Sequence, residues 1–335
     1  MKFSILVPAY NEEQAISSCL NSLTSLPDTN TEIIVIDDAS ADRTSQNVEK
    51  FLDKGILLIK RKKNGGRAAA LNSGLQKATG NVIITTDADT IVPSNWIQRF
   101  TSCFEQQGVV AVGGAYQANN KDKPLSHAAG ILDQILNGVF KKSLIPNKLS
   151  GVNSAVLKEA LLKSGGFNEN SWWSEDSELG WKLGKLGKVV YDPKNIVSTQ
   201  YPDTWSGIWR RKFYWGYAMG MKFREQIPFR INLWIRPLLF MALFISLLTF
   251  LGTIPFGTKV FLIPCLIFLI LLSSLTILYV PLGAIVMVRN GDPGFLKTLP
   301  LLTILPIVRE FAYIYGMCLG FCKGRVGSIK PSWKK

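Results

Sequence analysis

The sequence contains one histidine, His127, and only five cysteines in 335 residues. A lone histidine cannot build a metal site from several imidazoles, and no Ser-His-Asp arrangement can be argued from it. An odd number of cysteines without close pairing argues against a disulfide framework. We therefore expect neither a disulfide-stapled domain nor a histidine-based catalytic centre.

Charged residues are missing from two long stretches near the C-terminus. Residues 237–256 and 260–288 contain no Asp, Glu, Lys or Arg. Because about 20 apolar residues in a helix suffice to cross a bilayer core, both stretches predict transmembrane helices. A third apolar stretch, 298–322, is interrupted by Arg309 and Glu310. Because charges at mid-bilayer depth are costly, this stretch is a weaker candidate for a span, and the alternative is a helix that lies in the interface.

Acidic residues are outnumbered, 24 against 38 basic ones, which gives a net charge of +14. Basic residues cluster just before the first predicted span, and the short loop after it carries only Lys259. Anionic membrane lipid is therefore a nearer partner than nucleic acid, and we expect no nucleic-acid partner. The same bias places the N-terminal part in the cytosol, at the plasma membrane if the chain is prokaryotic. The apolar run before Pro8 is too short for a secretory signal. We predict a cytosolic domain over 1–225 and a membrane region over 226–335.

Apolar strand signals alternate with helix signals in the first half of the chain. The strand signals are FSILVPA, EIIVID, ILLIK and NVIITTD, and the helix signals cover 11–23, 42–52 and about 71–78. Repeated β-α-β order with apolar strands predicts an α/β fold, a Rossmann-like, mostly parallel sheet flanked by helices.

Acidic residues follow three of these strands. The first strand leads to Glu12, the second ends at Asp37 and Asp38, and the fourth ends at Asp87 and Asp89. The carboxyl ends of parallel strands meet at one edge of a sheet, where ligands of such folds bind. Helix capping explains one Asp at a strand end, but not a pair at two of them. Gathered carboxylates repel one another unless a cation or hydrogen-bond donors lie among them.

The spacing Asp87-x-Asp89 suits a hard divalent cation that also binds substrate phosphates. The basic segment KRKKNGGR, residues 60–67, follows the third strand at the same predicted edge. Such a run is usually a solvated loop. Here, however, Gly65 and Gly66 also open the next helix, whose N-terminus favours an anion such as a diphosphate.

A second acidic cluster lies at Trp172, Trp173, Glu175 and Asp176, before an amphipathic helix pattern. The carboxylates could simply compensate the helix dipole. Alternatively, one of them is a general base, and the tryptophans desolvate it and stack on a sugar ring.

Residues 205–220, WSGIWRRKFYWGYAMG, combine aromatic and basic side chains. An interfacial amphipathic helix explains this composition. Arg210 and Arg211 could equally reach a diphosphate, and both interpretations stay open.

Several short motifs then occur in a fixed order: VPAYNE (7–12), DDAS (37–40), an N-G-x-x-A-x-N-x-G-like pattern ending at Gly74, DAD (87–89), GGF (165–167) and SEDSELGWKLGKLG (174–187). Together they resemble family 2 glycosyltransferases with the GT-A fold, over residues 3 to about 220. The resemblance implies an inverting transfer of a sugar from a nucleotide-sugar donor, UDP- or GDP-linked, with Mg²⁺ or Mn²⁺ as cofactor.

The resemblance also implies roles for individual residues. Asp176 would be the catalytic base, with Glu175 beside the acceptor, and Trp172 and Trp173 would contact acceptor or sugar. Asp89 would be the better metal ligand of the D-x-D pair. The residues implied in nucleotide-sugar binding are Pro8, Ala9, Tyr10, Glu12, Asp37, Asp38, Gly66, Arg67, Asp87, Ala88, Arg210 and Arg211.

One departure concerns the product. Processive synthases of this family carry Q-x-x-R-W after the acidic motif, whereas Gln200 is followed here by YPDTW. This difference favours transfer of a single sugar. The predicted spans favour a membrane-associated acceptor, such as a polyprenyl phosphate, a glycolipid or a lipid-linked oligosaccharide.

The alternatives are a processive polysaccharide synthase, a nucleotidyltransferase and an inactive membrane scaffold. A nucleotidyltransferase would be expected to open with a basic glycine-rich loop, whereas VPAYNEE is acidic. The retained carboxylates at 38, 87, 89 and 176 argue against an inactive scaffold.

Overall fold

The computed structural model describes residues 1–27, 30–139, 147, 149–170, 175–224, 285, 295–298 and 300–323. They fall into two compact units. Unit 1 takes its described residues from 1–120 and 141–200, and unit 2 from 121–140 and 201–329. The predicted spans 237–256 and 260–288 lie outside the described residues, apart from residue 285, as do Trp172 and Trp173. The predicted division at residue 225 stays a prediction.

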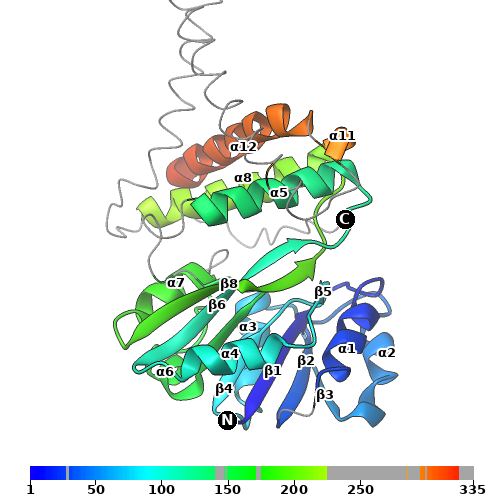
Figure 1. The fold of residues 1–335 in the computed structure, drawn as a ribbon, viewed down its shortest axis with the longest axis vertical. Helices are drawn as coiled ribbons and strands as arrows, with labels where there is room; N and C mark the ends of the chain where they lie inside the picture. Colours follow the sequence, from blue (N-terminus) through cyan, green and yellow to red (C-terminus); the bar gives the residue numbers. More distant parts are fainter. Residues whose placement is uncertain are drawn as a thin grey trace, which may run out of the picture. The chain divides into compact units, whose positions relative to one another are not determined.

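The described part of unit 1 contains an eight-stranded sheet in the order β3-β2-β1-β4-β7-β6-β8-β5 (Figure 1). Strands β1 to β4 are joined by parallel pairs, as the β-α-β pattern predicts. Farther along the sheet, β7 runs antiparallel to β4 and β6, and β5 runs antiparallel to β8. The sheet is therefore parallel in its N-terminal half and mixed in the remainder. The strands are β1 Phe3–Ala9, β2 Thr31–Asp37, β3 Ile56–Lys60, β4 Val82–Thr85, β5 Thr90–Ile91, β6 Val109–Ala118, β7 Ser154–Leu157 and β8 Lys188–Thr199.

Helices cover both faces of this sheet. Two of the expected helices begin later than the sequence pattern suggests, α1 at Ile16 and α2 at Thr44. The N–H of Asn11 donates to Ser40 Oγ at 2.9 Å, and that of Glu12 donates to Thr44 Oγ1 at 2.7 Å. These bonds tie the loop after β1 to the loop after β2. The helices of unit 1 are α1 Ile16–Thr24, α2 Thr44–Glu49, α3 Arg67–Leu75, α4 Trp96–Phe104, α6 Lys158–Lys163 and α7 Glu175–Leu183, with a 3-10 turn, η1, at Leu52–Lys54.

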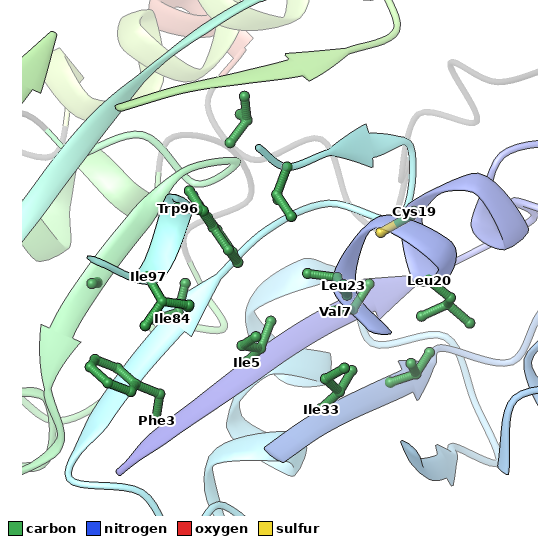
Figure 2. Packing of buried hydrophobic residues seen from close by; sticks show 14 of the residues in the cluster. Phe3, Ile5, Val7, Cys19, Leu20, Leu23, Ile33, Ile84, Trp96 and Ile97 are labelled. Atoms are coloured by element: carbon green, nitrogen blue, oxygen red, sulfur yellow. The ribbon is translucent and has the colours of Figure 1, made fainter. Parts of the chain in front are cut away.

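The strand period of two explains how the core is divided. Phe3, Ile5 and Val7 alternate along β1 and pack in one cluster with α1 and α4, where Trp96 is fully buried (Figure 2). Leu6 points to the opposite face and packs in a second cluster with α3, α6 and α7. Because both faces are covered there, the central strands β1 and β4 and the C-terminal part of β2 are mainly apolar.

Unit 2 contains α5 Pro124–Val139, α8 Trp205–Arg224, α11 Phe295–Thr298 and α12 Leu301–Lys323. Helices α8 and α12 meet at glycines. A Cβ on Gly216 would collide with the carbonyl of Tyr313, and one on Gly316 would collide with the carbonyl of Phe213. The missing side chains therefore let the two backbones approach closely, as in many packed membrane helices.

The third apolar stretch of the sequence forms α12, which carries its charges in the middle. Within the described residues, Leu301–Gly320 is the one helical segment long and apolar enough to cross a membrane by length and composition. Its Arg309 is buried and forms an ion pair with Asp133 of α5. Asp133 also accepts a hydrogen bond from the Tyr201 hydroxyl at 3.1 Å and lies 3.5 Å from Lys212 Nζ. The mid-helix charge that makes a simple span costly thus has a buried partner.

Candidate active site

The predicted edge of the sheet brings the strand ends together. In the parallel register, Ala9 lies opposite Asp37, and Asp37 lies opposite Lys60. Strand β4 ends at Thr85, directly before the segment that carries Asp87. The acidic residues that follow β2 and β4 and the basic segment after β3 therefore belong to one edge of unit 1, as the sequence predicts.

The residues after β1 and β2 form connected loops. Ala9 is buried, whereas Tyr10 is 41% exposed, which leaves its ring available to stack on a ligand. The Asp37 carboxylate accepts hydrogen bonds from the N–H of Ser40 at 2.9 Å and from the Ser45 hydroxyl. Asp37 therefore shapes the turn that follows its own strand.

The Asp38 carboxylate is buried and holds the loop that opens α3. It accepts hydrogen bonds from the N–H groups of Gly65 at 2.9 Å and Gly66 at 2.7 Å, and it is paired with Arg61. Gly66 has φ 86°, a left-handed conformation that favours glycine. Asp38 thus positions the N-terminus of α3, and its predicted contact with base or ribose stays a prediction.

Arg67, the first residue of α3, lies at the centre of the site. Its Nε donates to Asp87 Oδ1 at 2.9 Å, and its Nη1 donates to Glu175 Oε1 at 2.7 Å. Its Nη2 donates to the carbonyl of Gly151 at 2.6 Å. One guanidinium therefore joins the D-x-D segment, the start of α7 and the loop before β7.

The two adjacent carboxylates at the start of α7 have different partners. Asp176 Oδ2 accepts a hydrogen bond from the N–H of Gly151 at 3.0 Å, and its Oδ1 accepts one from the N–H of Ser177 at 2.7 Å. Glu175 binds Arg67 instead. Burial raises the pKa of the Glu175 carboxyl above its ordinary value; Arg67 opposes the shift and the negative charge of Asp176 adds to it. Glu175 and Asp176 are therefore unequal in environment.

The D-x-D segment offers oxygen donors of the kind that Mg²⁺ or Mn²⁺ prefers. The Asp87 side chain is 40% exposed, and Asp89 Oδ1 accepts a hydrogen bond from the Thr199 hydroxyl at 3.1 Å. Ala88 between them is buried. Among the described residues, no three His, Cys, Asp or Glu side chains form a group that could hold an ion. The donor set fits a cation that takes its remaining ligands from water and substrate phosphate.

Comparison with known proteins then assigns this half of the chain to a family. Residues 4–162 match the family model described as Glycosyl transferase family 2. These residues belong to glycosyl transferase family 2.

Relatives of this glycosyltransferase domain include bacterial polysaccharide synthases. A poly-beta-1,6-N-acetyl-D-glucosamine synthase of Staphylococcus aureus is 28% identical over 219 residues, covering 63% of this chain and 53% of that protein. The Staphylococcus epidermidis protein of the same name matches to the same extent. The chain spans about half the length of the curated relatives it matches.

Solved structures of similar shape show the fold. A mannosyltransferase from Pyrobaculum calidifontis, PcManGT, solved with GDP-Man and Mn²⁺, has a TM-score of 0.62 at 17% identity, covering 97% of this chain and 88% of that one. Staphylococcus aureus TarS has a TM-score of 0.51 at 18% identity, covering 95% of this chain and 55% of that one. The expected GT-A-like α/β architecture is confirmed.

Two of the residues predicted to bind the nucleotide-sugar belong to unit 2. Arg210 and Arg211 belong to α8 of unit 2, where the Arg211 guanidinium lies 4.7 Å from the centre of the Tyr201 ring. Their predicted contact with a diphosphate stays a prediction, as does the acceptor contact of Trp172 and Trp173.

Sequence reasoning missed the part that Gly151 plays in the glycosyltransferase. Its carbonyl accepts hydrogen bonds from Arg67 and, at 3.0 Å, from the Thr85 hydroxyl, while its N–H donates to Asp176. These contacts use main-chain atoms, which other residue types also have, so the residue type does not reveal them. The available signal was the glycine itself, since a Cβ there would lie 3.0 Å from Arg67 Cζ.

Proposed function

We propose that the chain is an inverting glycosyltransferase that moves one sugar from a nucleotide-sugar donor to a membrane-associated acceptor. The observation that carries this proposal is the bridge through Arg67. Arg67 forms an ion pair with Asp87, which belongs to the segment that would bind the cation and the donor diphosphate. It also forms an ion pair with Glu175, next to the proposed base Asp176. The Arg67 guanidinium thus binds a carboxylate on the proposed donor side, Asp87, and one on the proposed acceptor side, Glu175.

The proposed chemistry is an in-line displacement. Asp176 takes the proton of the acceptor hydroxyl as its oxygen forms a bond to the anomeric carbon, while the bond from that carbon to the diphosphate breaks. Attack opposite the leaving group inverts the configuration. The hydrogen bonds from Gly151 and Ser177 fix the Asp176 carboxylate in place, which a general base requires. Glu175 flanks the acceptor.

The donor side rests on the loops after β1, β2 and β3. Pro8 lies at the end of β1, and Tyr10, Glu12 and Asp38 belong to these loops. Gly66 opens α3, whose N-terminal amide groups would face an anion. Asp89 and Asp87 would hold Mg²⁺ or Mn²⁺. When bound, the cation neutralises charge that develops on the departing diphosphate.

The membrane association of the acceptor is supported by several features of the chain. Residues 237–256 and 260–288 are long, uncharged and apolar. Helix α12 satisfies the length and composition of a span, and α8 carries five basic residues and no acidic one. A polyprenyl phosphate, a glycolipid or a lipid-linked oligosaccharide would each present its reacting group at such a surface.

Processive synthesis is the second candidate, because the curated relatives are named as polysaccharide synthases. The absence of Q-x-x-R-W after Gln200 supports transfer of one sugar instead.

A donor panel tests both candidates. Membrane fractions containing the chain are incubated with UDP- and GDP-sugars, with and without EDTA, and released nucleotide and product size are measured. One donor should release nucleotide in a cation-dependent manner and give a product enlarged by one sugar. A ladder of products would favour the synthase. If no donor releases nucleotide above an Asp176→Asn control, the proposed function is wrong.

A further inference from the structure

The Arg67 guanidinium contacts three separate parts of unit 1. It donates to Asp87 after β4, to Glu175 at the start of α7 and to the carbonyl of Gly151 before β7. Its side chain is 25% exposed, and that of Glu175 only 12%. Water therefore screens the pair with Glu175 less than it screens surface pairs, and breaking that pair leaves the Glu175 carboxylate in a poorly hydrated position.

The geometry of the bridge requires arginine. The Nε, Nη1 and Nη2 atoms donate in three directions within one rigid plane. A lysine ammonium is a compact point charge and cannot reproduce this planar fork. Substitution by lysine would therefore keep the positive charge and break the connection between the two carboxylates.

Gly151 extends the connection to the proposed base. The same residue that accepts from Arg67 donates its N–H to Asp176. The space at Gly151 is also matched to the guanidinium, because a Cβ there would lie 3.0 Å from Arg67 Cζ and Nη1. A methyl group at this position would push the guanidinium away without removing any charge.

We infer that Arg67 is a positioning residue that couples the donor side of the site to the acceptor side, through Asp87 at one end and Glu175 and Gly151 at the other. This inference rests on the proposed function, because it needs a nucleoside diphosphate to bind next to Asp87. A ligand that engages Asp87 competes with Arg67 Nε for the same carboxylate. The guanidinium then changes its contacts with Glu175 and Gly151, and the start of α7 responds.

Such coupling is reciprocal at equilibrium. If donor binding changes the affinity of the α7 end for a ligand by some factor, a ligand bound at that end changes the affinity for the donor by the same factor. The coupling needs a rigid bridge and not merely a nearby positive charge. It follows that a variant with the charge but without the fork should lose the response at α7 even when it is saturated with nucleotide.

Hydrogen–deuterium exchange of the full chain in detergent tests the coupling. The probes are UDP and GDP, each with Mn²⁺, and nucleotide binding is measured separately by calorimetry. In the wild type, exchange of the α7 amides, Glu175–Leu183, should change by roughly fivefold when the nucleotide binds, as expected for a typical coupling. In Gly151→Ala, nucleotide should still bind and this change should be absent; in Arg67→Lys the change should be absent at nucleotide concentrations that calorimetry shows to be saturating.

The matched control is Arg99→Lys. Arg99 makes a two-point ion pair with Asp192, at 2.9 and 3.0 Å, on α4 and β8 of the same unit. This variant should keep the wild-type response at α7.

The outcomes separate the inference from the function on which it rests. An α7 response that persists in both Arg67→Lys and Gly151→Ala would overturn the coupling, and so would a wild type that binds nucleotide without any α7 response. If neither UDP nor GDP binds the wild type, the proposed function fails and the coupling fails with it. Gly151→Ala retains every charge, so its α7 response decides between the outcomes if Arg67→Lys does not fold.

Discussion

Replacing Asp176 by asparagine removes the proposed base with the smallest change in shape. The Asp176 carboxylate accepts two main-chain hydrogen bonds, from Gly151 at 3.0 Å and from Ser177 at 2.7 Å. Asparagine has one carbonyl oxygen, so one of these N–H groups would face an amide nitrogen that cannot accept. The substitution therefore has a structural effect as well as a chemical one, and the two effects differ in size.

The structural effect is the smaller. Losing one hydrogen bond to a charged acceptor at a half-buried position costs about 1–2 kcal/mol. For a domain of this size, that lowers Tm by roughly 2–4 °C for each kcal/mol. General-base assistance is worth about 10²–10⁴-fold, or about 3–5 kcal/mol of barrier. We therefore expect kcat to fall by about that factor, with donor Kd nearly unchanged.

The assay combines single-donor nucleotide release, donor binding by calorimetry and thermal unfolding of the same preparations. Glu178→Gln is the control, because Glu178 lies on the same helix and binds Asn168 and Lys182 instead of the site. It should retain near-normal kcat. A wild-type kcat in Asp176→Asn would refute the assignment of the base. If donor binding falls as strongly as kcat in Asp176→Asn, Asp176 maintains the shape of the site and is not the base.

Three further predictions follow from the same structure. Asp89→Asn, like EDTA on the wild type, should abolish cation-dependent nucleotide release while Tm stays near wild type; full activity in EDTA would exclude the proposed cation. Because burial raises the pKa of Glu175, its folded form holds a proton more tightly than its unfolded form. The free energy of unfolding of the wild type should therefore fall relative to that of Glu175→Gln as the pH rises above the ordinary glutamate pKa of about 4.3. Urea unfolding at several pH values measures this difference, and a difference that grew with pH would contradict the prediction. Arg309→Met removes the buried cation paired with Asp133, leaves Lys212 near that carboxylate, and should cost up to about 3–5 kcal/mol. Lys163→Met breaks an exposed pair with Glu159 and should cost at most about 1 kcal/mol; equal Tm shifts in detergent would contradict the contrast.

The sheet edge could be predicted because it depends on patterns that a single sequence displays. Strands buried on both faces appear as continuous apolar runs, so β1, β2, β3 and β4 were recognisable together with their parallel order. Since parallel strands end at the same edge, the positions of Asp38 and Asp87 followed directly.

The remaining features depend on contacts between distant segments. No local pattern shows that β7 runs antiparallel to β4, or that the Asp38 carboxylate binds the N–H groups of Gly65 and Gly66. Arg67 was recognised as basic and close to an anion site. Its bridge to Glu175 could not be foreseen, because that contact joins residues separated by 108 positions.

The composition of unit 2 has a consequence for biosynthesis. Helices α5, α8 and α12 come from three widely separated parts of the chain, and the buried partner of Asp133 is supplied by the last of them. A ribosome completes Asp133 and the glycine face of α8 long before it reaches Arg309 and Gly316. During that interval Lys212 is the cation that lies near Asp133, and the glycine face has no α12 to receive it. The helical unit can therefore close only after α12 has been made, so a chain released before α12 would carry all the carboxylates of the unit 1 network but an incompletely packed unit 2.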